Sequence, residues 1–113
     1  MPRRNSETGT TEWPSLKGLD RLLEHRIRLG VCVLLSRNDA LSFSRLKEFL
    51  KETDGSLGAH LRKLEEAGYL SLRREFLDRK PVTWYALTRA GRASLKSHLA
   101  ALHEVIQSGP SAG

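Results

Sequence analysis

The sequence predicts a mainly helical α+β domain in which one β-hairpin precedes a long C-terminal helix. Apolar residues recur at helical spacing up to about residue 67, alternate with polar residues between about 69 and 87, and return to steps of three and four after Thr88. A length of 113 residues suits one small domain with a single core. We expect the folded domain to span residues 16–107.

The two ends of the chain lack any such period. Residues 1–15 are polar and mix Thr, Ser, Glu, Gly and Pro, which predicts a mobile N-terminal arm, and residues 108–113 predict a disordered tail. From about Leu16 to Ser36 the apolar spacing predicts a first helix. Leu29 and Val33 widen its apolar stripe, so one side of this helix needs a partner.

A short helix and a second, longer helix follow. Leu41–Phe43 is either a strand or an entry turn, and Ser44 stands where the N-cap of the short helix is expected. The next helix is predicted over 54–67, with Thr53 or Asp54 as its cap and Gly68 as its left-handed C-terminal stop. The sequence therefore predicts that a tight turn joins these two helices.

The 54–67 helix has two distinct faces. Leu57, Leu61 and Leu64 form the buried stripe. The opposite face is small near its N-terminal end and basic further along; it carries Gly55, Ser56, Ala59, Arg62 and Lys63, with His60 at its margin.

Residues 69–87 alternate as two strands of a hairpin. Its connection, residues 76–81, reads as longer than a tight turn and places Arg79 and Lys80 at a projecting tip. Thr88 then caps a last helix, residues 88–107, whose apolar positions form a coiled-coil-like seam at Leu95, Leu99, Leu102 and Ile106.

The charge is uneven along the chain. The net charge is +6, from 19 basic and 13 acidic residues, which favours a polyanionic partner. Residues 42–92 hold 11 basic and 7 acidic groups, whereas residues 93–113 hold one of each. We therefore expect nucleic acid to meet the middle of the chain and protein to meet its C-terminal helix.

Several classes of protein are disfavoured. No stretch approaches the roughly 20 apolar residues that span a bilayer, and no apolar segment follows the basic N-terminus, so we expect a cytoplasmic protein with no membrane partner. The sequence also lacks a glycine-rich phosphate loop and any local nucleophile–base pair. We therefore expect neither catalysis nor a cofactor.

The predicted element order is that of a winged helix-turn-helix with a two- or three-stranded wing. Two segments resemble motifs of small transcriptional regulators in the MarR/ArsR superfamily, and of the MarR-like subgroup most closely: residues 58–70, GAHLRKLEEAGYL, resemble the recognition-helix signature, and residues 87–92, LTRAGR, resemble the sequence that ends the wing. The resemblance covers about residues 19–106. It implies a DNA-binding regulator that dimerises through its terminal helices.

The resemblance and helix geometry together give candidate contacts with double-stranded DNA. An α-helix fits the major groove, where its N-terminal residues approach the bases. The resemblance carries base reading to Ser56, Ala59 and His60. The full set of candidate DNA-binding residues is Gly55, Ser56, Ala59, His60, Arg62, Lys63, Arg79 and Lys80.

Each candidate has a structural alternative. His60 is otherwise a partly buried core residue beside an apolar stripe. Arg62 and Lys63 are otherwise a solvated face paired with Glu65 and Glu66, and the tip cations are otherwise an ordinary polar turn.

The first and last helices carry more apolar surface than one small core requires, which predicts a homodimer. The candidate interface consists of Leu22, Leu29, Val33, Leu95, Leu99, Leu102 and Ile106. A two-fold dimer predicts a palindromic operator, and occupancy of that operator predicts a repressor. The alternative is that the seam packs only on the domain's own first helix.

Other functions have weaker support in the sequence. Cys32 sits alone between valines and reads as a buried thiol, and His98, His103 and Glu104 do not share one helix face well, so no metal site is expected. The sequence does not decide whether a small-molecule effector binds. The alternative function is a winged-helix protein-interaction module that docks a partner through the same face or through Trp84.

Overall fold

The structure is a computed structural model that describes residues 14–109 and 111. Its elements are the 3-10 helices η1 (Pro14–Gly18) and η2 (Arg21–Glu24), then α1 (Arg26–Ser36), β2 (Leu41–Ser42), α2 (Phe43–Leu50), α3 (Asp54–Glu66), β3 (Leu70–Leu77), β4 (Lys80–Leu87) and α4 (Arg89–Ser108). The strands form one antiparallel sheet in the order β2-β4-β3. The predicted mainly helical α+β fold, with a three-stranded wing, is confirmed.

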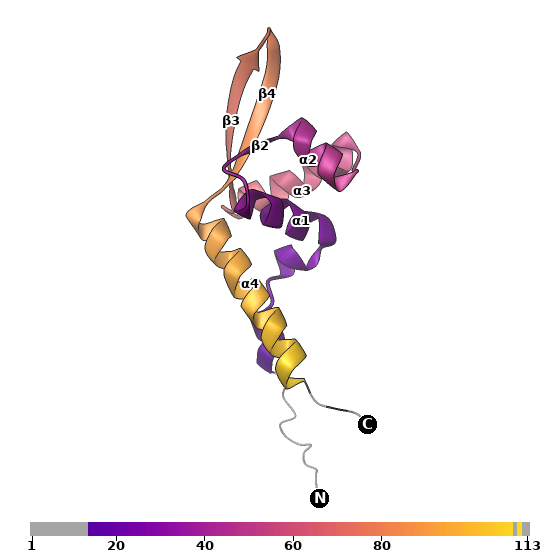
Figure 1. The fold of residues 1–113 in the computed structure, drawn as a ribbon, viewed down its shortest axis with the longest axis vertical. Coiled ribbons are helices and arrows are strands. Elements are labelled where there is room, and N and C mark those ends of the chain that lie inside the picture. The colour runs from indigo at the N-terminus through magenta and orange to yellow at the C-terminus, as the bar shows by residue number, and fades with distance from the viewer. Residues whose placement is uncertain (1–13, 110, 112–113) are drawn as a thin grey trace, which may run out of the picture.

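The elements are arranged around a central body from which two elements project. Figure 1 shows α1, α2 and α3 grouped at the centre, the β3–β4 hairpin extending from one end, and α4 leaving toward the opposite end. The η1 segment lies against α4, away from the central helices. The basic hairpin and the C-terminal half of α4 are therefore far apart.

A single apolar core joins the helices to the base of the hairpin. Leu57, Leu61 and Leu64 of α3 are buried in it, as the sequence predicts. The rest of the core comes from every other major element: Leu23, Ile27, Val31, Cys32, Leu35, Leu41, Leu46, Leu70, Tyr85 and Leu95. Burial of these side chains, each contributing about 1.5–3 kcal/mol, fixes the orientation of α3.

The end of α3 is bonded directly to the start of α4. The Thr88 hydroxyl donates to the Gly68 carbonyl (2.7 Å), and the Thr88 amide donates to the Tyr69 carbonyl (3.0 Å). Thr88 also caps α4 by accepting from the Gly91 amide (2.9 Å). Gly68 has φ of +84°, the left-handed conformation predicted for the helix stop.

Asp20 ties the N-terminal segment to both of these elements. Its amide donates to Nδ1 of His98 on α4 (2.9 Å), and its carboxylate accepts from the Tyr69 hydroxyl. The other carboxylate oxygen accepts from the Leu22 amide (2.9 Å), which caps η2. His98 is only 4% exposed, so its partner inside the fold is required.

The predicted single helix from Leu16 to Ser36 is wrong in its first half. The segment is two 3-10 turns, and α1 begins at Arg26. The side chains of Asp20 and His25 bond to the amides of Leu22 and Ile27, respectively, so each starts a new element and interrupts the helix.

Two predicted boundaries also change. The N-cap of α2 is Ser42 and not Ser44, because the Ser42 hydroxyl accepts from the Arg45 amide (3.2 Å) while its backbone is still paired in β2. Leu41–Ser42 is therefore a strand rather than an entry turn. For α3, Thr53 is the cap and Asp54 is the first helical residue.

The hairpin connection is a tight turn and not the predicted long loop. Strand pairing continues to Leu77 opposite Lys80, so only Asp78 and Arg79 turn the chain. Both have positive φ, +52° and +67°, as a type I′ turn requires. The sequence does not signal this turn, because neither residue is the glycine that usually marks it.

The predicted mobile arm, residues 1–15, lies outside the described residues except for Pro14 and Ser15, which belong to η1 instead. Of the predicted tail, residues 110, 112 and 113 are not described. Ser108, assigned to the tail, is the last residue of α4, and its hydroxyl donates to the Glu104 carbonyl (2.6 Å). Within the described residues, none of the helices has the length and apolar character needed to cross a bilayer.

The close approach at Gly91 gives a matched pair of stability predictions. A Cβ at Gly91 would lie 2.3 Å from the Tyr69 carbonyl oxygen, whereas a Cβ at Gly58 in α3 meets nothing within 4 Å. Gly91→Ala should lower the free energy of unfolding by about 1–3 kcal/mol. Gly58→Ala should raise it by up to about 1 kcal/mol, since alanine favours a helix interior. Urea unfolding followed by circular dichroism measures both; equal stability of the two variants would contradict the packing at Gly91.

Candidate nucleic-acid interface

The exposed face of α3 has the composition that the sequence predicts. Gly55 and Ala59 are exposed near its N-terminal end, and Ser56 is half-buried between them. Arg62 and Lys63 are exposed one to two turns later. The small side chains leave room for close approach of a ligand to the helix, and the two cations lie beyond them.

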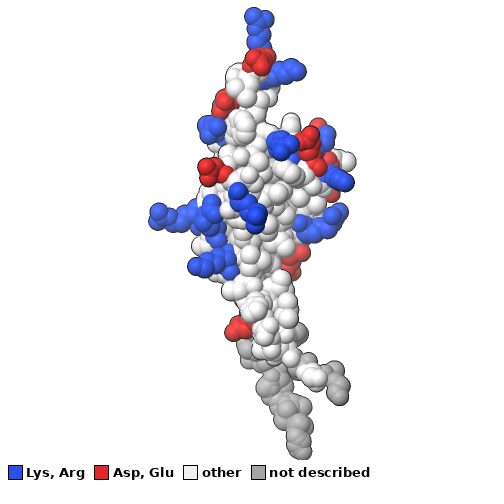
Figure 2. All heavy atoms as spheres, viewed as in Figure 1, with Lys and Arg blue, Asp and Glu red and all other residues white. Residues whose placement is uncertain are grey.

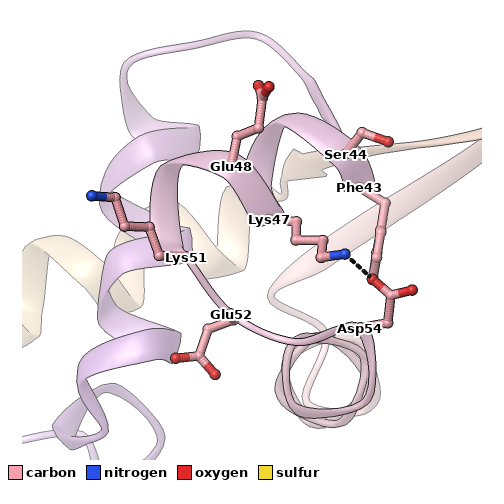
Figure 3. A pocket seen from close by; sticks show the side chains of 7 residues that line it. All are labelled: Phe43, Ser44, Lys47, Glu48, Lys51, Glu52 and Asp54. Atoms are coloured by element: carbon pink, nitrogen blue, oxygen red, sulfur yellow. Dashed lines mark ion pairs between the residues drawn. The ribbon is translucent and has the colours of Figure 1, made fainter.

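The turn between α2 and α3 is fixed by local bonds. Lys51 ends α2 with a left-handed φ of +54°, and the Thr53 hydroxyl accepts from the Ser56 amide (3.2 Å). Lys47 Nζ then reaches across to Oδ1 of Asp54, 2.8 Å away, as Figure 3 shows. Asp54 is therefore ion-paired at the helix start rather than serving as its cap, and this exposed pair links α2 to the first turn of α3.

A surface hollow of about 620 Å³ lies beside this ion pair (Figure 3). Basic and acidic side chains both line it; the lining residues are Phe43, Ser44, Lys47, Glu48, Lys51, Glu52 and Asp54. The mixed signs distinguish this hollow from the exposed face of α3.

The cations of α3 and of the hairpin tip are available to a partner. The ion pairs within residues 14–109 are Arg26–Glu52, Arg45–Glu48, Lys47–Asp54 and Arg73–Glu75. None of these pairs includes Arg62, Lys63, Arg79 or Lys80. Within residues 14–109, Arg62 and Lys63 are therefore not paired with Glu65 or Glu66. In Figure 2, Lys and Arg side chains gather over the body and the hairpin, whereas the end formed by α4 is largely uncharged.

His60 lies at the junction of α3 with the start of α1. An Arg28 guanidinium nitrogen is 3.0 Å from its Nδ1, and its ring centroid is 4.1 Å from that of His25. Arginine can only donate, so Nδ1 of His60 accepts and its Nε2 carries the proton. Partial burial, His25 and Arg28 together lower the pKa of His60 from 6.5, which keeps the ring neutral at pH 7.

Arg28 and His25 are neighbours of His60 that the sequence does not reveal. Besides contacting His60, the Arg28 Nε donates to the Leu22 carbonyl (2.7 Å) and so bridges α3 to η2. No local motif marks either residue, because the contact joins positions 32 residues apart. The bond between Asp20 and His98 is hidden from the sequence for the same reason.

The hairpin carries its two tip cations at the point farthest from the core. Arg79 is in the turn itself, and Lys80 is paired with Leu77 in the last rung. Both are exposed. Trp84 is on the opposite face of β4 from the buried Tyr85. Its ring lies under the Arg73 guanidinium, whose carbon is 6.0 Å from the ring centroid.

The candidate dimer residues differ in how much surface they expose. Leu99, Leu102 and Ile106 of α4 are 43%, 39% and 71% exposed. Leu95 is only 5% exposed because it belongs to the protomer's own core, so it has little surface to offer a second copy. The remaining candidates are half-buried: Leu22, Leu29 and Val33.

The residues considered for metal or redox chemistry are placed separately. Cys32 is fully buried, as predicted, and burial raises the pKa of its thiol to about 12. His98 is buried with Nδ1 engaged by Asp20, whereas His103 and Glu104 are exposed. Within residues 14–109, no three His, Cys, Asp or Glu side chains lie close enough together to hold a metal ion.

Comparison with known proteins gives consistent matches. The profile of the family described as "Winged helix DNA-binding domain" matches residues 27–106. An uncharacterized protein of Methanocaldococcus jannaschii is 32% identical over 81 residues, which cover 72% of this chain and 85% of that protein.

Solved structures match over a similar span. A transcriptional regulator homologue from Pyrococcus horikoshii OT3 is 30% identical, with a TM-score of 0.76, and the match covers 82% of this chain and 94% of that one. A putative transcriptional regulator from Thermoplasma acidophilum shares the fold at 21% identity, with a TM-score of 0.65 over 78% of this chain and 90% of that one.

The lowered pKa of His60 predicts a pH dependence of stability. A folded-state pKa below 6.5 means that the unfolded chain binds the proton more tightly, so stability is present above pH 6.5 and is lost as the pH falls below it. Between pH 7.5 and 5, the melting temperature of the wild type should fall more than that of His60→Gln. Thermal unfolding across this range measures the difference, and parallel curves would contradict it.

Proposed function

The chain belongs to the family of winged helix DNA-binding domains, and from that membership we propose that it is a homodimeric, sequence-specific transcriptional regulator of the MarR-like type. The observation that carries the proposal is the exposed face of α3, small at its start and basic beyond, beside a hairpin with cations at its tip. Within residues 14–109, none of these cations is held in an ion pair of the domain itself.

In this proposal α3 lies in the major groove of double-stranded DNA. Gly55 and Ala59 permit close approach, and Ser56 and Ala59 meet base edges. Arg62 and Lys63 neutralise phosphates. His60 donates through Nε2 to a base or phosphate while Arg28 holds its other nitrogen.

The wing contributes a second contact on the same DNA. Arg79 and Lys80 at its tip meet the minor groove or the adjacent backbone. These contacts neutralise phosphate charge and do not read the base sequence. They set the register of α3 on the duplex and make binding depend on salt.

We further propose that α4 forms the dimer. Its exposed leucines and Ile106, together with the exposed Leu16 on the adjacent η1, make an apolar surface that water does not favour. A two-fold dimer presents two recognition helices about 34–36 Å apart, which matches a palindromic operator. Occupancy of such an operator blocks polymerase, so we propose repression.

The alternative function is a protein-interaction module. Trp84 is its candidate anchor, yet the indole Nε1 is buried without a hydrogen-bond partner among the described residues. An indole donor that a partner is to bind needs an accessible N–H. The geometry therefore favours the DNA-binding proposal, and salt dependence separates the two.

DNA binding is tested on duplexes enriched by the wild type from a random pool, with affinity measured by anisotropy at several salt concentrations. A palindromic site should emerge. Arg79→Ala/Lys80→Ala should weaken binding to all sequences and reduce the salt slope by about 0.9 for each phosphate that the wing no longer neutralises. His60→Ala should instead change the sequence preference.

The matched control is Lys96→Ala, which removes an exposed cation from α4, away from α3 and the wing. This variant should keep the affinity and salt slope of the wild type. If no duplex is enriched and a protein complex insensitive to salt is found instead, the interaction module replaces the regulator.

Dimerisation is tested by sedimentation equilibrium. The wild type should sediment at twice the protomer mass, and Leu102→Glu should sediment as a folded monomer because a carboxylate would be buried in the apolar contact. Gln107→Glu, at an exposed position on another side of α4, is the charge control and should remain dimeric. A monomeric wild type at micromolar concentration would overturn the dimer.

A further inference from the structure

The tip of the hairpin carries large apolar side chains that the core does not use. Phe76 is 74% exposed and Leu77 is 47% exposed, and both lie in the last two rungs before the turn. Pro81 pairs with Phe76 and is also exposed. Exposed side chains of this size, gathered at one projecting point, mark an interaction site.

These side chains are held in a fixed register. The ladder between β3 and β4 runs without a break from Leu70 opposite Leu87 to Leu77 opposite Lys80. The two-residue turn leaves no loose loop. Phe76 is therefore presented by a regular hairpin, and its direction follows from the strand alternation.

Phe76 lies on the hairpin face that begins in the core. Leu72 and Tyr85 are at the base of this face, Arg74 and Thr83 are next, and Phe76 and Pro81 are last. At about 3.3 Å per residue, Phe76 is about 13 Å beyond Leu72. Along this face, core residues are therefore followed first by the cation of Arg74 and then by the exposed ring of Phe76.

We propose that Phe76 is a wedge that enters the minor groove of the bound DNA and partly unstacks one base step. The proposal rests on the proposed DNA-binding function and specifies how the wing acts within it. Proteins that bind the minor groove combine cations with apolar wedges of Phe, Leu or Pro and bend the duplex. The hairpin tip supplies both kinds of side chain.

The charge and size of the tip favour DNA over an apolar protein partner. Residues 70–87 carry four basic and two acidic side chains, so the hairpin as a whole is cationic, and Arg79 and Lys80 lie at its tip. The minor groove is about 6 Å wide, too narrow for a two-stranded hairpin with its side chains, so only the tip of the hairpin can enter it. That restricts contact to the turn and the last rungs, where Arg79 and Phe76 lie.

The experiment uses the duplex enriched by the wild type, labelled at both ends for energy transfer and carrying 2-aminopurine at successive flanking positions. Wild-type binding should raise 2-aminopurine fluorescence at one position in each flank and shorten the end-to-end distance. Phe76→Ala should lose both signals and bind about tenfold more weakly. Its salt slope should equal that of the wild type, because no cation is removed.

Two variants complete the comparison. Phe76→Leu keeps an apolar wedge and should retain part of the bend. Phe49→Ala removes a phenyl ring that is 50% exposed on α2, outside the hairpin, and should bind and bend DNA as the wild type does. Phe76 is exposed, so its replacement is not expected to unfold the domain.

Two outcomes would overturn the wedge. If the wild type binds its duplex and Phe76→Ala binds and bends it equally, the wedge fails while DNA binding stands. If the wild type enriches no duplex, both the wedge and the regulator fail, and loss of a protein complex in Phe76→Ala would assign the ring to a protein contact.

Discussion

The contact between the end of α3 and the start of α4 is the constraint on which the rest of the structure depends. Thr88 bonds to the Gly68 and Tyr69 carbonyls, and Gly91 has no Cβ to separate α4 from that backbone. Asp20 fastens the N-terminal segment to this contact through hydrogen bonds with Tyr69 and His98. α3, the wing and α4 are thereby held in one relative orientation.

This orientation separates two chemical surfaces. The cations gather over the body and wing, while α4 ends in an apolar, nearly uncharged surface (Figures 1 and 2). Because α4 is 20 residues long, about 30 Å at 1.5 Å per residue, it keeps the two surfaces apart.

The sequence predicts the elements whose signals are local. Thr88 as a cap, Gly68 as a stop and the alternation after Tyr69 each act within a few residues, and the resemblance of the two motifs to winged-helix regulators is confirmed by family membership. The bond between Thr88 and Gly68 is not predictable in the same way, since it joins residues 20 apart. The prediction of one long N-terminal helix is wrong for a similar reason: Asp20 competes with the helix for backbone bonds and is anchored by α4.

The turn at the end of the wing places a charged side chain, Arg79, at a position where glycine would be more stable. Asp78 and Arg79 both adopt positive φ, where glycine or asparagine is preferred. Holding a non-glycine residue there costs on the order of 1–2 kcal/mol. A chain selected for folding stability alone would place glycine at Arg79 and lose the guanidinium farthest from the core. The wing tip is therefore a position where a more stable sequence and a more cationic one exclude each other.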